Sequence, residues 1–140
     1  SSRGGCESLL QTYVVQPNGN IASCCGLSMR IIPELNTGKI SENEKFLSMA
    51  IKKSESDFLK MWIHYKGPER ILQWANNLDP EIRWENMYAH KCQACFRIYK
   101  DKKIRDVIKN NYKSMFAEVI ISAFIDEEYL PKKMNQIVRE

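Results

Sequence analysis

The sequence has no long run of apolar residues, so it predicts no membrane-spanning helix. It has no internal repeat and no low-complexity tract, which excludes a repeat architecture. It offers no specific serine–histidine–aspartate arrangement for nucleophilic catalysis and no phosphate-binding loop. The first residues, SSRGG, lack the charged-then-apolar pattern of a secretory signal. What is left is a chain of 140 residues, the size of one ordinary domain, whose chemistry must come from other residue types.

The charge of the chain is only mildly unbalanced. There are 21 basic and 17 acidic residues, which give a net charge of +4. Nucleic-acid-binding domains usually concentrate basic side chains in one patch. The basic residues between Lys102 and Lys113 instead have the spacing of the solvent-facing side of a helix. We therefore expect neither a nucleic-acid partner nor a membrane partner.

Five cysteines are the most informative residues of the chain. They are Cys6, Cys24, Cys25, Cys92 and Cys95. An odd number without a signal peptide argues against the disulfide framework of a secreted protein and favours the cytoplasm. In a reducing compartment, clustered thiols indicate a metal ion, an iron–sulfur cluster or redox chemistry.

The patterns of the first half predict an α+β fold, in which a small N-terminal β-hairpin is followed by a helical majority. Residues 9–15 are rich in β-branched and aromatic side chains, and the Asn18-Gly19 turn leads to a returning strand over residues 20–25. Ser41 and Glu44 fit a capping box that would start the first long helix.

The second half is predicted to be mainly helical. Ser56 is a candidate cap for a second helix, and Pro68 suits the first turn of a third. Residues 81–101 are expected to be partly looped, and the strongest helical periodicity runs from Lys102. We expect residues 1–101 to form the main unit and residues 102–140 to be a helical extension of the same domain.

The spacing of the cysteines predicts a shared inorganic centre. In the CxxC formed by Cys92 and Cys95, two intervening residues let both sulfurs face one point. Two further thiolates would complete either a four-cysteine zinc site or a [4Fe–4S] site. Adjacent side chains of a strand face opposite sides, so only one of Cys24 and Cys25 can point at this centre. We predict Cys6, Cys24, Cys92 and Cys95 as ligands, with Cys25 in reserve.

Other interpretations of the thiols remain open. Common zinc sites with four cysteine ligands have two short cysteine pairs, and only one half of this set has that form, which favours a cluster over zinc. The thiols could also be core residues of an ordinary helical binding domain, because free cysteine is often buried. His90 is expected to support the centre rather than bind it, and His64 is expected at the edge of the core.

Four segments together resemble a known family: Cys6, QPNGNIASCC, GPERIL and YAHKCQAC. They are similar to the C-terminal auxiliary-cluster domain of radical S-adenosylmethionine enzymes, the SPASM/twitch group, and the single-cluster twitch form fits best. The resemblance covers residues 5–101. It implies a hairpin and helices around one [4Fe–4S] cluster, which would serve electron transfer or support the substrate pocket.

The chain also departs from that family. The CxxxCxxC motif of the catalytic half is absent, so the chain is not expected to cleave S-adenosylmethionine alone. We expect a radical S-adenosylmethionine catalytic domain in cis or in trans, which would bind S-adenosylmethionine and act on a peptide or a small metabolite. The alternative function is a zinc-stapled helical interaction module without a redox role.

Overall fold

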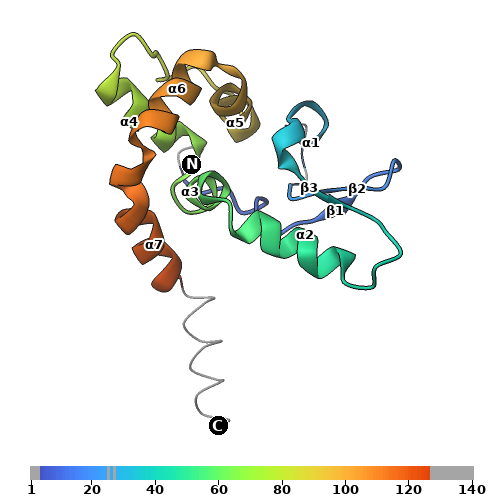
Figure 1. Ribbon diagram of the computed structural model, residues 1–140. Coiled ribbons are helices and arrows are strands. Elements are labelled where there is room, and N and C mark those ends of the chain that lie inside the picture. The colour runs from blue at the N-terminus through green and yellow to red at the C-terminus, as the bar shows by residue number, and fades with distance from the viewer. Residues whose placement is uncertain (1–3, 25, 27, 127–140) are drawn as a thin grey trace.

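The computed structural model describes residues 4–24, 26 and 28–126. Its elements are β1 (Val14–Val15), β2 (Asn20–Ala22), α1 (Ser28–Ile31), the 3-10 turn η1 (Pro33–Leu35), β3 (Asn36–Lys39), α2 (Phe46–Glu55), α3 (Phe58–Lys66), α4 (Pro68–Leu78), α5 (Lys91–Lys100), α6 (Lys102–Asn111), the 3-10 turn η2 (Tyr112–Met115) and α7 (Phe116–Phe124). A small sheet with α1 and α2 lies on one side and the remaining helices lie on the other (Figure 1). The predicted α+β fold with a helical majority is therefore confirmed.

The sheet is antiparallel, with the strand order β1-β2-β3. The predicted hairpin is present but shorter than expected, with Val15 opposite Ile21. Its turn depends on Gly19, whose φ of 84° suits a residue without a side chain. The third strand, β3, was not predicted, because its sequence NTGK lacks the alternating apolar residues that mark a half-buried strand.

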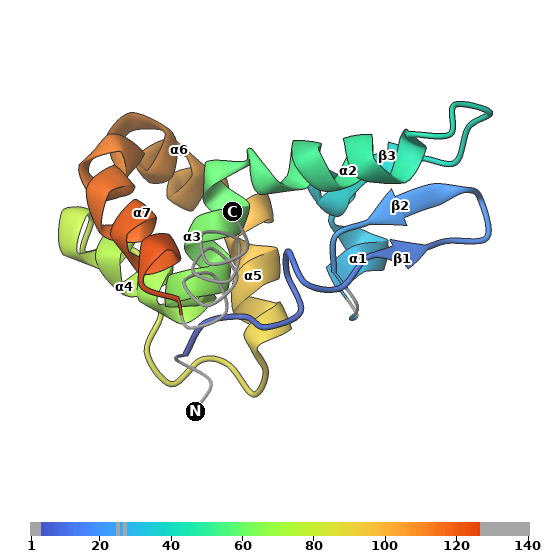
Figure 2. The same ribbon diagram turned by 90° about the horizontal axis from the view of Figure 1, so that it is seen from below.

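Helix α2 covers the sheet at β3, along which it runs in Figure 2. The Thr37 hydroxyl donates to the Ala50 carbonyl over 2.6 Å, which ties the strand to the helix. A methyl group at Gly38 would lie 2.8 Å from the Ala50 Cβ atom. The close approach of β3 and α2 therefore requires glycine at position 38.

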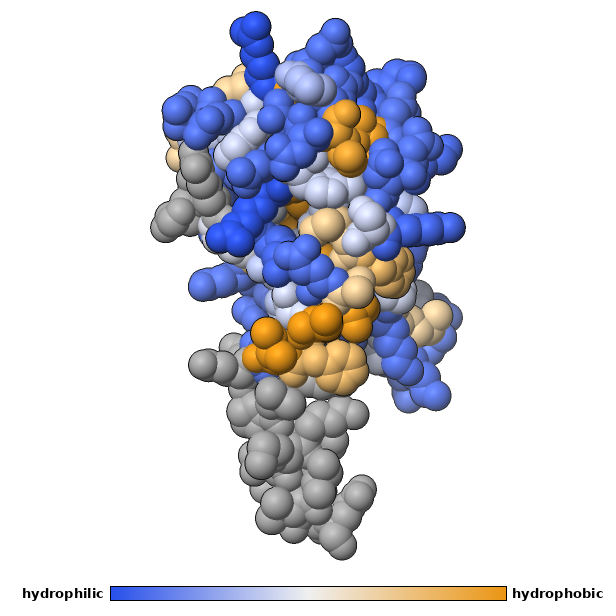
Figure 3. Space-filling view, turned by 90° about the vertical axis from the view of Figure 1, so that its left-hand side faces the viewer, coloured by the Kyte–Doolittle hydropathy of each residue, from blue (hydrophilic) through white to orange (hydrophobic). Residues whose placement is uncertain are grey.

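The main core lies among the helices α3 to α7. Its fully buried side chains include Trp62, Ile63, Ile71, Leu72, Ile98, Ile104 and Val119. Phe58 of α3 stacks on Phe116, the first residue of α7, with ring centroids 4.4 Å apart. Helix α7 still exposes Ile121 and Phe124, and apolar side chains gather at the lower end of the face in Figure 3.

Several predicted element boundaries were wrong. The Ser41–Glu44 box does not start a helix, because α2 begins at Phe46 with Lys45 as its N-cap. Asp57, rather than Ser56, caps α3 by accepting from the Lys60 amide.

Residues 81–101, expected to be partly looped, contain the helix α5, which carries the CxxC. From Lys102 onward, the helical pattern is divided into α6 and α7 by the turn η2. The part of the predicted C-terminal extension beyond residue 126 lies outside the described residues. Within the described ranges, no helix combines the length and apolar character needed to cross a bilayer.

Gly38→Ala should destabilise the protein by about 1–3 kcal/mol, because the added methyl group must push β3 away from α2. Urea denaturation followed by circular dichroism measures this loss. Lys52→Ala, at an exposed position of α2, is the matched control and should change the stability by less than about 0.5 kcal/mol. Equal stability of the two variants would contradict the tight contact.

Candidate metal centre

Cys6 is held on the N-terminal segment by contacts with α3. Its amide donates to the Ile63 carbonyl over 3.2 Å, and its carbonyl lies 2.8 Å from His64 Nδ1. A methyl group at Gly5 would lie only 2.2 Å from the His64 carbonyl oxygen. The segment can approach α3 this closely because residue 5 is glycine, and this approach fixes the position of Cys6.

Cys24 follows strand β2 and is buried, with 7% of its surface exposed. The preceding residue, Ser23, anchors it, because the Ser23 amide and hydroxyl both donate to the Leu35 carbonyl. Two residues later, a methyl group at Gly26 would lie 3.3 Å from the Cys92 sulfur. Gly26 therefore lies directly against the CxxC. Cys25, the reserve ligand, lies outside the described residues.

Cys92 and Cys95 lie in the first turns of α5, not in a separate tight turn. His90 caps this helix, since its Nδ1 atom accepts from the Cys92 amide over 3.1 Å. The Gln93 side chain accepts from the His90 amide and completes the cap. His90 thus positions the CxxC through the backbone, and its support of a bound centre stays a prediction. The positive end of the helix dipole lies at this end of α5, which carries the two thiols.

Two long-range hydrogen bonds join α5 to the other cysteine segments. The Lys91 ammonium donates to the Gly5 carbonyl over 2.7 Å, next to both Cys6 and Cys92. The Ser28 hydroxyl donates to the Cys92 carbonyl over 3.2 Å. Helix α5 is therefore linked on one side to the segment of Cys6 and on the other to the segment that follows Cys24. In Figure 1, α5 lies between α1 and α6.

Three of the predicted ligands act electrostatically on the fourth, Cys95. Burial raises the pKa of the Cys95 thiol, and Cys6, Cys24 and Cys92 raise it further. Such an effect requires that the thiols lie close to one another, because the interaction between charges falls with distance. None of the four is in a disulfide. Cys95 therefore lies within electrostatic range of the other three, which come from segments far apart in sequence.

The four thiols do not form a ready site for one ion. Among residues 4–24, 26 and 28–126, no group of three or more His, Cys, Asp or Glu side chains has the geometry to hold a metal ion. In a zinc site, each sulfur must come to about 2.3 Å from the same ion. In a cubane, each thiolate binds a different iron atom, so the sulfurs stand farther apart. A cluster and a single ion therefore require different spacings of the four sulfur atoms.

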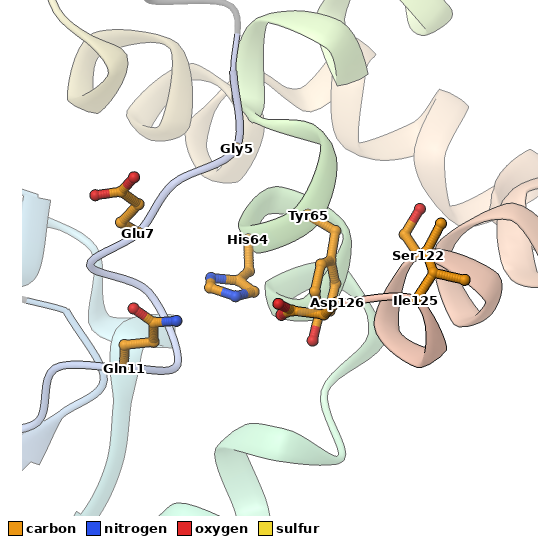
Figure 4. Close-up of a pocket in the computed structure, with 8 residues that line it drawn as sticks. All are labelled: Gly5, Glu7, Gln11, His64, Tyr65, Ser122, Ile125 and Asp126. Carbon is orange, nitrogen blue, oxygen red and sulfur yellow. The ribbon is translucent and has the colours of Figure 1, made fainter. Parts of the chain in front are cut away.

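A hollow lies on the outer side of Cys6, between the N-terminal segment, α3 and the end of α7. Its volume is about 730 Å³, and its lining includes Gly5, Glu7, His64 and Asp126. Figure 4 shows the His64 ring between Glu7 and Gln11 on one side and Tyr65 on the other. The same ring contacts the Cys6 carbonyl, so His64 links the hollow to the backbone of a predicted ligand. It is partly buried at the edge of the core, as predicted.

Comparison with known proteins returns no match: no family model, no curated protein and no solved structure matches the chain.

If Cys6 is a metal ligand as predicted, Gly5→Ala should weaken metal retention by roughly 10–100-fold, the loss typical when the support of a ligand is removed. The physical reason is that the methyl group must displace the Cys6 segment from α3. The concentration of chelator that strips the metal measures this effect. Glu7→Ala, an exposed change on the same segment, is the control. Wild-type metal retention in a folded Gly5→Ala variant would contradict the role of this contact.

Proposed function

We propose that the chain is an auxiliary [4Fe–4S] cluster-binding domain that works with a radical S-adenosylmethionine catalytic domain. Cys6, Cys24, Cys92 and Cys95 would hold the cluster. The observation that carries this proposal is the gathering of three distant thiols near Cys95, each of which raises its pKa. The three thiols come from segments far apart in sequence, so their common proximity to Cys95 is a property of the fold rather than of local spacing.

Three further points support a four-thiolate cluster. Common four-cysteine zinc sites have two short pairs, whereas here one short pair, Cys92 and Cys95, is joined by two separate thiols. The dipole of α5 points its positive end at the CxxC, which suits a centre with an excess of thiolate charge. Four protein ligands would leave no iron open to a substrate, so the cluster would supply one-electron chemistry or structural support.

The substrate side of the proposed domain is the hollow next to Cys6. A volume of about 730 Å³ lies in the range of small-molecule pockets, roughly 300–1,000 Å³. A peptide side chain or a small metabolite bound there would lie one residue away from a cluster ligand. The catalytic domain, in cis or in trans, would bind S-adenosylmethionine and generate the radical. A reducing compartment such as the cytoplasm would keep the thiols available.

Anaerobic reconstitution with iron and sulfide tests the proposal. We expect about four iron atoms per chain and a brown protein, as for a cubane held by four cysteines. Single changes of Cys6, Cys24, Cys92 or Cys95 to Ser should each lower the iron content of the purified protein. Cys25→Ser is the matched control and should keep wild-type iron.

Three outcomes would contradict this assignment in different ways. A colourless protein with one tightly bound zinc ion would favour the zinc-stapled interaction module. A protein that binds neither metal, with Cys92→Ser and Cys95→Ser together leaving its melting temperature unchanged, would favour plain core thiols. Loss of iron in Cys25→Ser but not in Cys24→Ser would show that Cys25, rather than Cys24, is the ligand.

A further inference from the structure

Tyr99 carries a buried hydroxyl group without a hydrogen-bond partner. Only 6% of the residue is exposed, and its hydroxyl oxygen is among the buried polar atoms that find no partner. A buried hydroxyl without a partner costs free energy, because it loses its hydrogen bonds to water and gains none in return. A buried polar group without a partner in a native core requires a specific explanation. One explanation is that a bound group supplies the acceptor.

The position of Tyr99 on α5 directs it toward the thiols. It follows Cys95 by four residues, so the two side chains lie on the same face of the helix. Helical side chains lean toward the N-terminus, and the phenol ring therefore extends over the turn that carries Cys95. Cys24 belongs to the same buried cluster as Tyr99, and Cys95 packs against that cluster.

Two carboxylates that act electrostatically on Tyr99, those of Asp57 and Glu34, each have another partner. The Asp57 carboxylate accepts from the Lys60 amide, and the Glu34 carboxylate pairs with the Lys100 ammonium over 3.6 Å. Burial raises the pKa of Tyr99 well above its usual value, and among the charges that add to this, Cys95 has the largest effect. The hydroxyl therefore keeps its proton and remains a hydrogen-bond donor.

We propose that Tyr99 donates a hydrogen bond to a sulfur atom of the cluster and thereby raises its reduction potential. This inference rests on the proposed function. A hydrogen bond to a sulfur stabilises the reduced cluster, which carries one more negative charge, more than the oxidised cluster. Tyr99 is a positioning residue in this account, since it binds no iron itself.

The test is a redox titration of the reconstituted full chain and its Tyr99→Phe variant. We expect the iron content to stay the same and the reduction equilibrium to become about tenfold less favourable, a shift of about 59 mV to more negative potential. Tyr13→Phe is the matched control, because it removes another buried hydroxyl that lies beside Ser54 on α2. The control should leave the potential unchanged.

A second variant covers the case in which phenylalanine disturbs packing. Replacement of Tyr99 alone by 3-fluorotyrosine keeps the ring and makes the hydroxyl a stronger donor, so the potential should rise. If either variant carries a full cluster with the wild-type potential, the role of Tyr99 is overturned while the cluster proposal stands. A wild-type chain that takes up no iron overturns both.

Discussion

The structure depends on the meeting of three distant chain segments at the first turns of α5. The N-terminal segment brings Cys6, the end of the hairpin brings Cys24, and the helix itself brings Cys92 and Cys95. Gly5 and Gly26 have no side chain, which allows the close contacts of these segments. The long side chain of Lys91 reaches from α5 to the Gly5 carbonyl. The thiols are thus positioned by backbone contacts rather than by the cysteines themselves.

In this arrangement, the small sheet holds Cys24 in position. A short hairpin is only marginally stable alone, and here it gains support from β3 and from α2 packed on that strand. Ser23 transmits this support to Cys24 through its two hydrogen bonds to the Leu35 carbonyl. On the opposite side, the helical core fixes α3, which in turn holds Cys6. The proposed centre therefore lies where the sheet and the helical body meet, and it would link them.

The sequence predicts some of these features and not others, for physical reasons. The Asn18-Gly19 turn and the CxxC are local signals, so the hairpin and the pairing of Cys92 with Cys95 could be predicted. Strand β3 could not be predicted, because its polar sequence forms a strand only by pairing with β2 and packing against α2. The contacts of Lys91 with Gly5 and of His64 with Cys6 join residues far apart, and no spacing rule reveals them. Tyr99 has a weak signal, its four-residue spacing from Cys95, but its unpartnered hydroxyl appears only in the folded chain.

The most direct measurement is anomalous X-ray scattering at the iron edge from crystals of the anaerobically reconstituted protein. The account predicts one compact iron peak enclosed by the sulfur atoms of Cys6, Cys24, Cys92 and Cys95, with the N-terminal segment still against α3. An iron peak elsewhere, or clear density for these four sulfurs turned away from one another with nothing between them, would contradict it.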